Sequence, residues 1–194
     1  MEIKHFIDTR IFYAFLAVFI ALSAFFFASS PQRSVLPNLP LILVFLIPIL
    51  TANSLKLQSD ERSSALRVVL AKFIAVMVVY VVALATTVLY SISYAQLYIG
   101  FLFYGAAMAA IGIFISSVAK NQAVAAIVSF GVMFILNFVD MLGLWSGNMM
   151  FARVVNFISF SNRIFDVNLI SILYFTLIAT LFTLLTIHKL NRRR

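Results

Sequence analysis

Long apolar runs recur throughout this sequence and leave little polar sequence between them. A helix of about 20 apolar residues crosses the hydrocarbon core of a bilayer, which is about 30 Å thick. Hydrophobic residues make up 64% of the 194 residues and charged residues 10%, against about 45–50% and about 25% in soluble domains. Such a chain cannot present a polar surface to water on every side. The sequence therefore predicts an all-α polytopic membrane protein.

Six of these runs predict six transmembrane helices in a single domain that covers residues 1–194. The expected spans are 11–28, 41–55, 68–90, 97–118, 123–144 and 169–187. Run 68–90 is rich in Val and Ile, which favour strands, but it is too long for a strand, and an open strand leaves its backbone unpaired in lipid. We therefore expect a helix there. Segment 147–168 mixes charged and apolar residues, which predicts one or two short amphipathic helices at the outer membrane surface.

The positive charge of the chain indicates its orientation. The net charge is +8, and Lys and Arg collect on the cytoplasmic side of membrane proteins, so we expect lipid rather than nucleic acid as the partner. If the amino terminus lies inside, the outer side holds only three basic residues, Arg33, Arg153 and Arg163. The cytoplasmic side then holds the other eleven of the fourteen. This bias predicts a multi-pass protein of the cell membrane with both termini in the cytoplasm.

The most polar interior stretch is segment 55–72, between the second and third expected spans. It contains Asp60 and Glu61, two of only six acidic residues. Ser59 is suited to cap a helix whose first turn would hold these two acids. Arg67 and Lys72, at the start of the third span, are expected to extend toward the membrane surface. The segment is either a handle for a soluble partner or a solvated loop whose charges only set the topology.

Small residues recur along span 97–118, among them Gly105, Ala109 and Gly112. Small residues about one turn apart let membrane helices approach closely. The pattern predicts helix packing, either within the chain or at a dedicated dimer face, and we favour packing within the chain.

Residues typical of catalysis or of metal binding are scarce. The chain has no Cys, and His5 and His188 lie near its opposite ends, which argues against a metal site. The spacing from Gly100 to Gly105 lacks the Lys-Ser/Thr ending of a phosphate-binding loop. We therefore expect a non-catalytic chain without a cofactor of its own. Asp140 is either a functional acid within the membrane or a solvated residue at the span edge.

Several segments together resemble the type-2 ABC-transporter permeases of the gliding-motility/copper-processing branch. The clearest is Ala-Ile-Gly-Ile-Phe-Ile-Ser-Ser-Val-Ala-Lys-Asn-Gln-Ala at 110–123, which is similar to the junction of that family's fourth and fifth spans. Ile-Pro-Ile-Leu-Thr at 47–51, Asp-Glu-Arg-Ser at 60–63 and Val-Leu-Ala-Lys-Phe-Ile-Ala at 69–75 follow its order. Segment 157–166 with Tyr174 and Phe175 is similar to the stretch before its last span.

The resemblance implies the permease subunit of an ATP-driven exporter. Such a subunit pairs with a second, identical or homologous permease chain and with two cytoplasmic ABC ATPase subunits, which bind ATP and Mg²⁺. The residues implied to contact the ATPase are Ser59, Asp60, Glu61, Arg62 and Ser63. The substrate path is expected between the two permease chains, lined by spans one, two and five. An external gate is expected from Phe157, Phe160, Arg163 and Asp166.

The chain departs from the family pattern after Ser63-Ser64, where part of the expected coupling region is missing. Either this permease has a reduced coupling region or segments of the natural chain have been left out, and we expect the second. Two other functions remain open beside transport. One is a membrane scaffold that an ATPase drives without moving a substrate, and the other is an intramembrane enzyme. The sequence does not name a substrate, because an apolar path suits peptides, lipids and amphipathic drugs alike.

Overall fold

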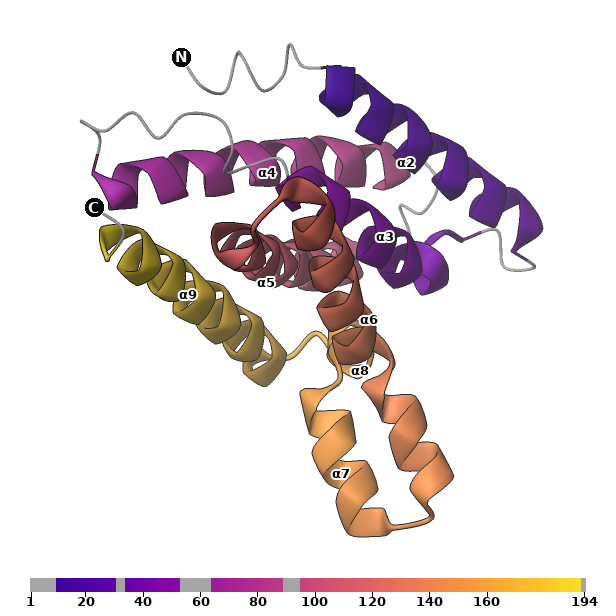
Figure 1. The fold of residues 1–194 in the computed structure, drawn as a ribbon. Helices are drawn as coiled ribbons and strands as arrows, with labels where there is room; N and C mark the ends of the chain where they lie inside the picture. The colour runs from indigo at the N-terminus through magenta and orange to yellow at the C-terminus, as the bar shows by residue number, and fades with distance from the viewer. Residues whose placement is uncertain (1–9, 31–33, 53–63, 89–94, 193–194) are drawn as a thin grey trace.

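The computed structural model describes residues 10–30, 34–52, 64–88 and 95–192, and every regular element within these ranges is helical (Figure 1). The elements are α2 (Arg10–Ser29), η1 (Leu36–Asn38), α3 (Leu39–Ala52), α4 (Ala65–Val88), α5 (Ala95–Val118), α6 (Gln122–Ser146), α7 (Met149–Ile158), α8 (Phe160–Phe165) and α9 (Leu169–Asn191). The prediction of an all-α fold is confirmed over this part of the chain. The Val-rich run within α4 is helical, as its length requires.

Four helices are long and apolar enough to cross a membrane, namely α4, α5, α6 and α9. The apolar parts of α2 and of η1–α3, Tyr13–Ser29 and Leu36–Ala52, are shorter. The structure therefore agrees with a multi-pass membrane protein. Of the six predicted spans, four meet the length and composition needed to cross.

Helix α5 lies at the centre of the molecule. It packs against α3, α4, α6, α8 and α9, and most extensively against α9; Figure 1 shows it enclosed by these helices. Gly and Ala residues along α5 allow this, since small side chains let neighbouring helices come close. Two of the largest fully buried side chains, Phe101 and Tyr104, are on α5 itself.

Asparagine side chains mark the beginnings of three helices. Asn121 accepts a hydrogen bond from the backbone N–H of Val124 at 2.8 Å and caps α6. Asn148 and Asn168 cap α7 and α9 in the same way. An Asn at this position satisfies backbone donors that the first helical turn leaves unpaired. Local sequence therefore determines where these helices begin.

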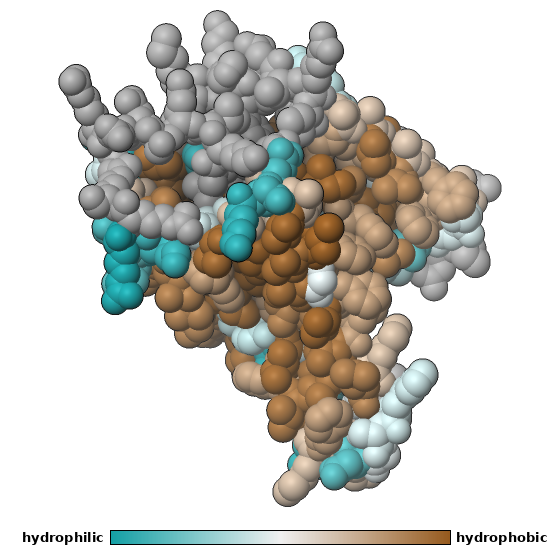
Figure 2. Space-filling model, viewed as in Figure 1, coloured by the Kyte–Doolittle hydropathy of each residue, from teal (hydrophilic) through white to brown (hydrophobic). Residues whose placement is uncertain are grey.

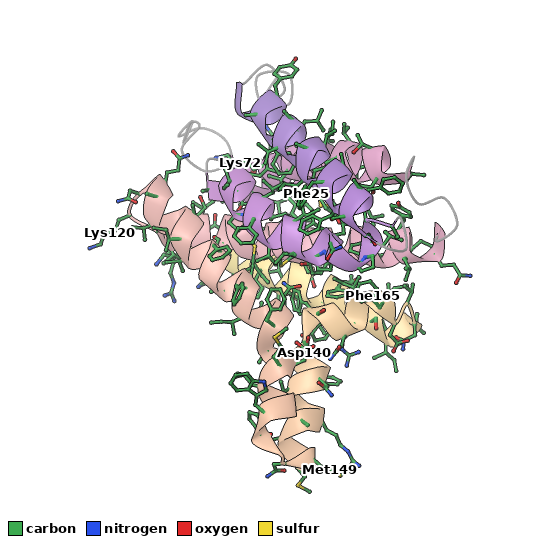
Figure 3. All side chains as sticks on the ribbon, turned by 90° about the vertical axis from the view of Figure 1, so that its right-hand side faces the viewer. Phe25, Lys72, Lys120, Asp140, Met149 and Phe165 are labelled. Carbon is green, nitrogen blue, oxygen red and sulfur yellow. The ribbon has the colours of Figure 1, made fainter. Side chains whose placement is uncertain are left out.

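The second half of α6 and α7 form an antiparallel hairpin that projects from the helical body (Figure 1). Gly147, with φ of 63°, makes the turn between the two helices. Trp145, Met149 and Met150 near this turn are all at least 80% exposed, and Figure 3 places Met149 at the tip. Figure 2 shows that the hydrophobic surface of the body continues onto the hairpin. The predicted segment 147–168 thus forms two helices, α7 and α8, which meet at Ser159.

Candidate functional site

Arg163 on α8 links segment 147–168 to the last long helix, α9. Its guanidinium carbon lies 4.2 Å from the ring centre of Phe157 and 4.8 Å from that of Tyr174 on α9. Its Nε also donates a hydrogen bond to the Phe157 carbonyl oxygen at 3.0 Å. A guanidinium held over aromatic faces is attracted by the negative potential of the rings. Arg163 therefore connects the end of α7, α8 and α9.

Phe160 fixes the same region from the inside. Its side chain is fully buried, and its ring meets those of Tyr104, Tyr174 and Phe175 edge to face, with centroids 5.2 to 6.0 Å apart. The Tyr174 hydroxyl donates a hydrogen bond to the Ile158 carbonyl oxygen at 2.9 Å. We call Phe157, Phe160, Arg163 and Tyr174 the Arg163 junction. Tyr174 was not among the predicted gate residues, although the aromatic pair at 174–175 was a signal for it.

Asp166, the fourth predicted gate residue, does not belong to the Arg163 junction. Its carboxylate accepts a hydrogen bond from the side-chain amide of Asn168 at 2.9 Å, in the turn that leads into α9. Asn168 in turn caps α9 by accepting from the backbone N–H of Ser171. The structure thus brings three of the four predicted gate residues together around Tyr174 and assigns Asp166 to the connection before α9.

The small residues of α5 contact neighbouring helices of the same chain. A Cβ added at Gly105 would overlap the ring of Tyr80 on α4, and one added at Gly112 would overlap the side chain of Thr51 on α3. Ala109, between them, is 1% exposed. The Tyr80 hydroxyl donates a hydrogen bond to the Phe101 carbonyl oxygen at 2.6 Å, which holds the ring in place. These positions set the distance of α4 and α3 from α5.

The predicted ATPase-coupling residues Ser59, Asp60, Glu61, Arg62 and Ser63 lie outside the described residues, as does the point where the chain departs from the family pattern. On either side of this segment, the described chain ends α3 and begins α4, and both helices pack on α5. The Ser116 hydroxyl of α5 donates a hydrogen bond to the carbonyl oxygen of Ala52, the last residue of α3, at 3.3 Å. The Ser64 hydroxyl accepts from the backbone N–H of Arg67 at 3.4 Å, at the start of α4. Segment 53–63 therefore joins two helix ends that both belong to the body.

Lys72 differs from its sequence prediction. Arg67 is exposed, as expected for a residue at the membrane surface, but Lys72 is only 7% exposed. The reason is its position on α4, since Lys72 falls on the inward stripe with Ala65, Val68, Val76 and Val79. The side chain of Lys72 is therefore part of the interior, in the half of α4 that follows segment 53–63 (Figure 3).

Asp140 lies where the hairpin leaves the body (Figure 3). The residue is partly buried, and its Oδ1 is buried without a hydrogen-bond partner in the described part of the chain. The carboxylate is thus neither fully buried nor fully solvated, and both interpretations from the sequence, a functional acid within the membrane and a solvated residue at the span edge, remain open. Within the described residues, no group of three or more His, Cys, Asp or Glu side chains could hold a metal ion.

Comparison with protein-family models, with curated proteins and with solved structures finds no match to this chain.

Proposed function

We propose that this protein is the membrane-spanning permease subunit of an ATP-driven exporter of the ABC type. It works with a second permease chain and with two cytoplasmic ATPase subunits, which bind ATP and Mg²⁺ and carry out the hydrolysis. The protein lies in the cell membrane with both termini in the cytoplasm. Helix α2, which has 20 residues and is about 30 Å long at 1.5 Å per residue, and η1–α3 complete the six spans.

One observation carries this proposal, namely that the two helices that flank segment 53–63 pack on the same central helix. Helices α3 and α4 both pack on the central α5, and α3 is also tied to it by the bond from Ser116 to Ala52. Because packed cores move as units rather than deform continuously, a displacement of segment 53–63 would shift α3 and α4 against α5. This is the response that a coupling segment needs.

In this mechanism the substrate path lies between two permease chains and is lined by α2, α3 and α6. ATP binding closes the ATPase pair, segment 53–63 moves, and the permease pair alternates between inward-facing and outward-facing states. The hairpin and α8 close the outer end of the path. The Arg163 junction supports this role, because it joins α8 to α9 and so links the gate to a membrane-spanning helix.

The test is to reverse charges in the coupling segment. In the Glu61→Lys and Arg62→Glu variants we expect loss of the ATPase from the complex purified from the host, and loss of transport. The reason is that docking of charged segments depends on complementary charge. The matched control is Arg192→Glu, which makes the same change at an exposed residue after α9. If both coupling variants kept the ATPase and transport at the level of the control, the docking proposal would be wrong.

A further inference from the structure

Asp140 is the only acidic residue in any helix longer than 10 residues within the described part of the chain. A carboxylate oxygen that is buried without a partner costs free energy, because it has lost water and gained no hydrogen bond. Such a group in a native fold calls for an explanation, and a missing ligand is one of the standard ones. Among the described residues, no hydrogen-bond donor contacts the buried Oδ1 of Asp140.

A second unpartnered polar group lies directly after the facing helix α7. Gly143 packs against Ala152, where an added Cβ would be 3.1 Å from the Ala152 Cα. This contact sets the register of the antiparallel hairpin, which places the buried Val155 opposite Asp140 and Ser159 one turn further. Ser159 is fully buried, and its hydroxyl has no hydrogen-bond partner among the described residues.

Tyr104 on α5 contacts both α6 and the first residue of α8. The Tyr104 hydroxyl donates a hydrogen bond to the side-chain oxygen of Asn137, one turn before Asp140 on α6, at 2.9 Å. The Tyr104 ring also lies 6.0 Å from that of Phe160, the residue after Ser159. Tyr104 therefore contacts the neighbour in sequence of Ser159 and the residue one turn before Asp140, and we call Asp140, Asn137 and Ser159 at the base of the hairpin the hairpin neck.

The chemistry of the hairpin neck favours a cation with several N–H donors. A carboxylate only accepts hydrogen bonds, and a serine hydroxyl can accept as well, whereas a primary ammonium group carries three donors. The basic residues of α7 and α8 do not fill this need, because Arg153 is exposed and Arg163 is engaged by Phe157 and Tyr174. The hydrophobic surface that continues onto the hairpin suits an apolar body attached to such a group (Figure 2).

We propose that Asp140 and Ser159 bind the ammonium group of an amphipathic organic amine, and that such amines are the substrate class of the exporter. The claim that amines are the exported substrate rests on the proposed permease function. The binding site itself rests only on the hairpin neck. The amine neutralises Asp140 and supplies the hydrogen bonds that the two side chains lack.

The sole tryptophan, Trp145, provides the measurement, because it lies on the hairpin five residues after Asp140. The full chain is reconstituted in phosphatidylcholine vesicles and titrated with dansylcadaverine, a primary amine whose fluorophore accepts energy from tryptophan. We expect saturable energy transfer from Trp145. Dansylamide, which lacks the amine, should give only the linear signal of partitioning into lipid.

The Asp140→Asn variant should bind dansylcadaverine at least about tenfold more weakly, because a charge-assisted hydrogen bond is lost. Asp140→Glu keeps the charge and should bind more tightly than Asp140→Asn, although its longer side chain disturbs packing more. Asp8→Asn removes one negative charge elsewhere and should bind as the natural protein does. Equal binding by Asp140→Asn and the natural protein, or equal saturation by dansylamide, would overturn the site.

The two proposals fail separately. If dansylcadaverine binds through Asp140 but no ATPase accompanies the chain from its host, the permease function is wrong and the amine site stands. If the ATPase is present and transport is intact, but the Asp140→Asn variant binds the amine normally, the amine site is wrong and the permease function stands.

Discussion

Gly105 determines how closely α4 approaches α5, since any side chain there meets the Tyr80 ring. We expect Gly105→Ala to lower the free energy of unfolding by about 1–3 kcal/mol, the usual cost of overfilling a packed interior. The measurement is the thermal unfolding midpoint of the purified protein in detergent. A second change, Tyr80→Ala, should remove the overlap, so the double variant should lose less stability than the sum of the two single variants.

Gly131→Ala is the matched control, because an added Cβ at Gly131 has nothing within 4 Å. This substitution should leave the unfolding midpoint unchanged or raise it slightly, since Ala has the higher helix propensity by about 1 kcal/mol. Equal destabilisation by Gly105→Ala and Gly131→Ala would contradict the role given to Gly105.

Lys72 shows that residue type alone does not predict which side chains are buried. A long basic side chain near the start of a span is expected to extend toward the membrane surface. Arg67 is exposed, as this expectation requires. Lys72 lies five residues further, on the face of α4 that points into the protein. Whether Lys72 is buried depends on the direction in which its side chain points from the axis of α4. In an almost uniformly apolar helix the sequence carries little information about which face points inward.

At the scale of the helices, the Arg163 junction predicts how stably α7 and α8 are folded. The Arg163→Gln variant keeps much of the side-chain length but loses the charge that is held over Phe157 and Tyr174. We expect amide hydrogen exchange in α7 and α8 to become about tenfold faster, because a cation–π contact and a hydrogen bond together contribute about 1.4 kcal/mol or more. Exchange in α4 and α5 should stay unchanged.

Arg153→Gln provides the comparison for that experiment, since Arg153 is an exposed basic residue of α7 itself. This variant should leave exchange in α7 and α8 within the error of the natural protein. If Arg153→Gln and Arg163→Gln accelerated exchange to the same degree, net charge rather than the Arg163 junction would hold the segment.

The positions of the helices could be predicted from the sequence far better than which helices pack against each other. Length and composition were sufficient for α4, α5, α6 and α9, because a long apolar run has no other structure available in lipid. Pairing was harder, since lipid-facing and protein-facing surfaces of such helices are equally apolar. The small residues of α5 were the one reliable signal, and α5 is the helix that the others approach most closely. The bond between Tyr104 and Asn137 could not be predicted, since a polar side chain within a span indicates a hydrogen bond but not which helix supplies the partner.

In the candidate site, too, local contacts could be predicted and tertiary contacts could not. Phe157, Phe160 and Arg163 could be grouped in advance because they lie within a few residues of one another, so local helix geometry brings them together. Tyr174 joins them only through the tertiary packing of α9. Asp166 was grouped with them by its proximity in sequence, but it hydrogen-bonds to Asn168 instead.

At the scale of the whole molecule, the orientation of α6 can be tested directly, because the sequence contains no cysteine. Lys120 and Asn148 are exposed residues just outside the two ends of α6. In intact cells we expect a membrane-impermeant maleimide to label the Asn148→Cys variant, and to label Lys120→Cys only after the cells are opened. Labelling of both from the same side would contradict a crossing α6 and the proposed topology.

The central position of α5 has a consequence for how the protein is made. A ribosome releases α2, α3 and α4 into the membrane before α5 and α6 exist, yet α3 packs mainly on α6 and α5, and α4 packs most extensively on α5. During that interval the nearly fully buried α3, which carries Pro48 and no charged residue, must be held in lipid or by insertion machinery. A nascent chain that stops before residue 95 therefore lacks the surface on which its first half assembles, and quality control in the membrane should treat it as unfinished.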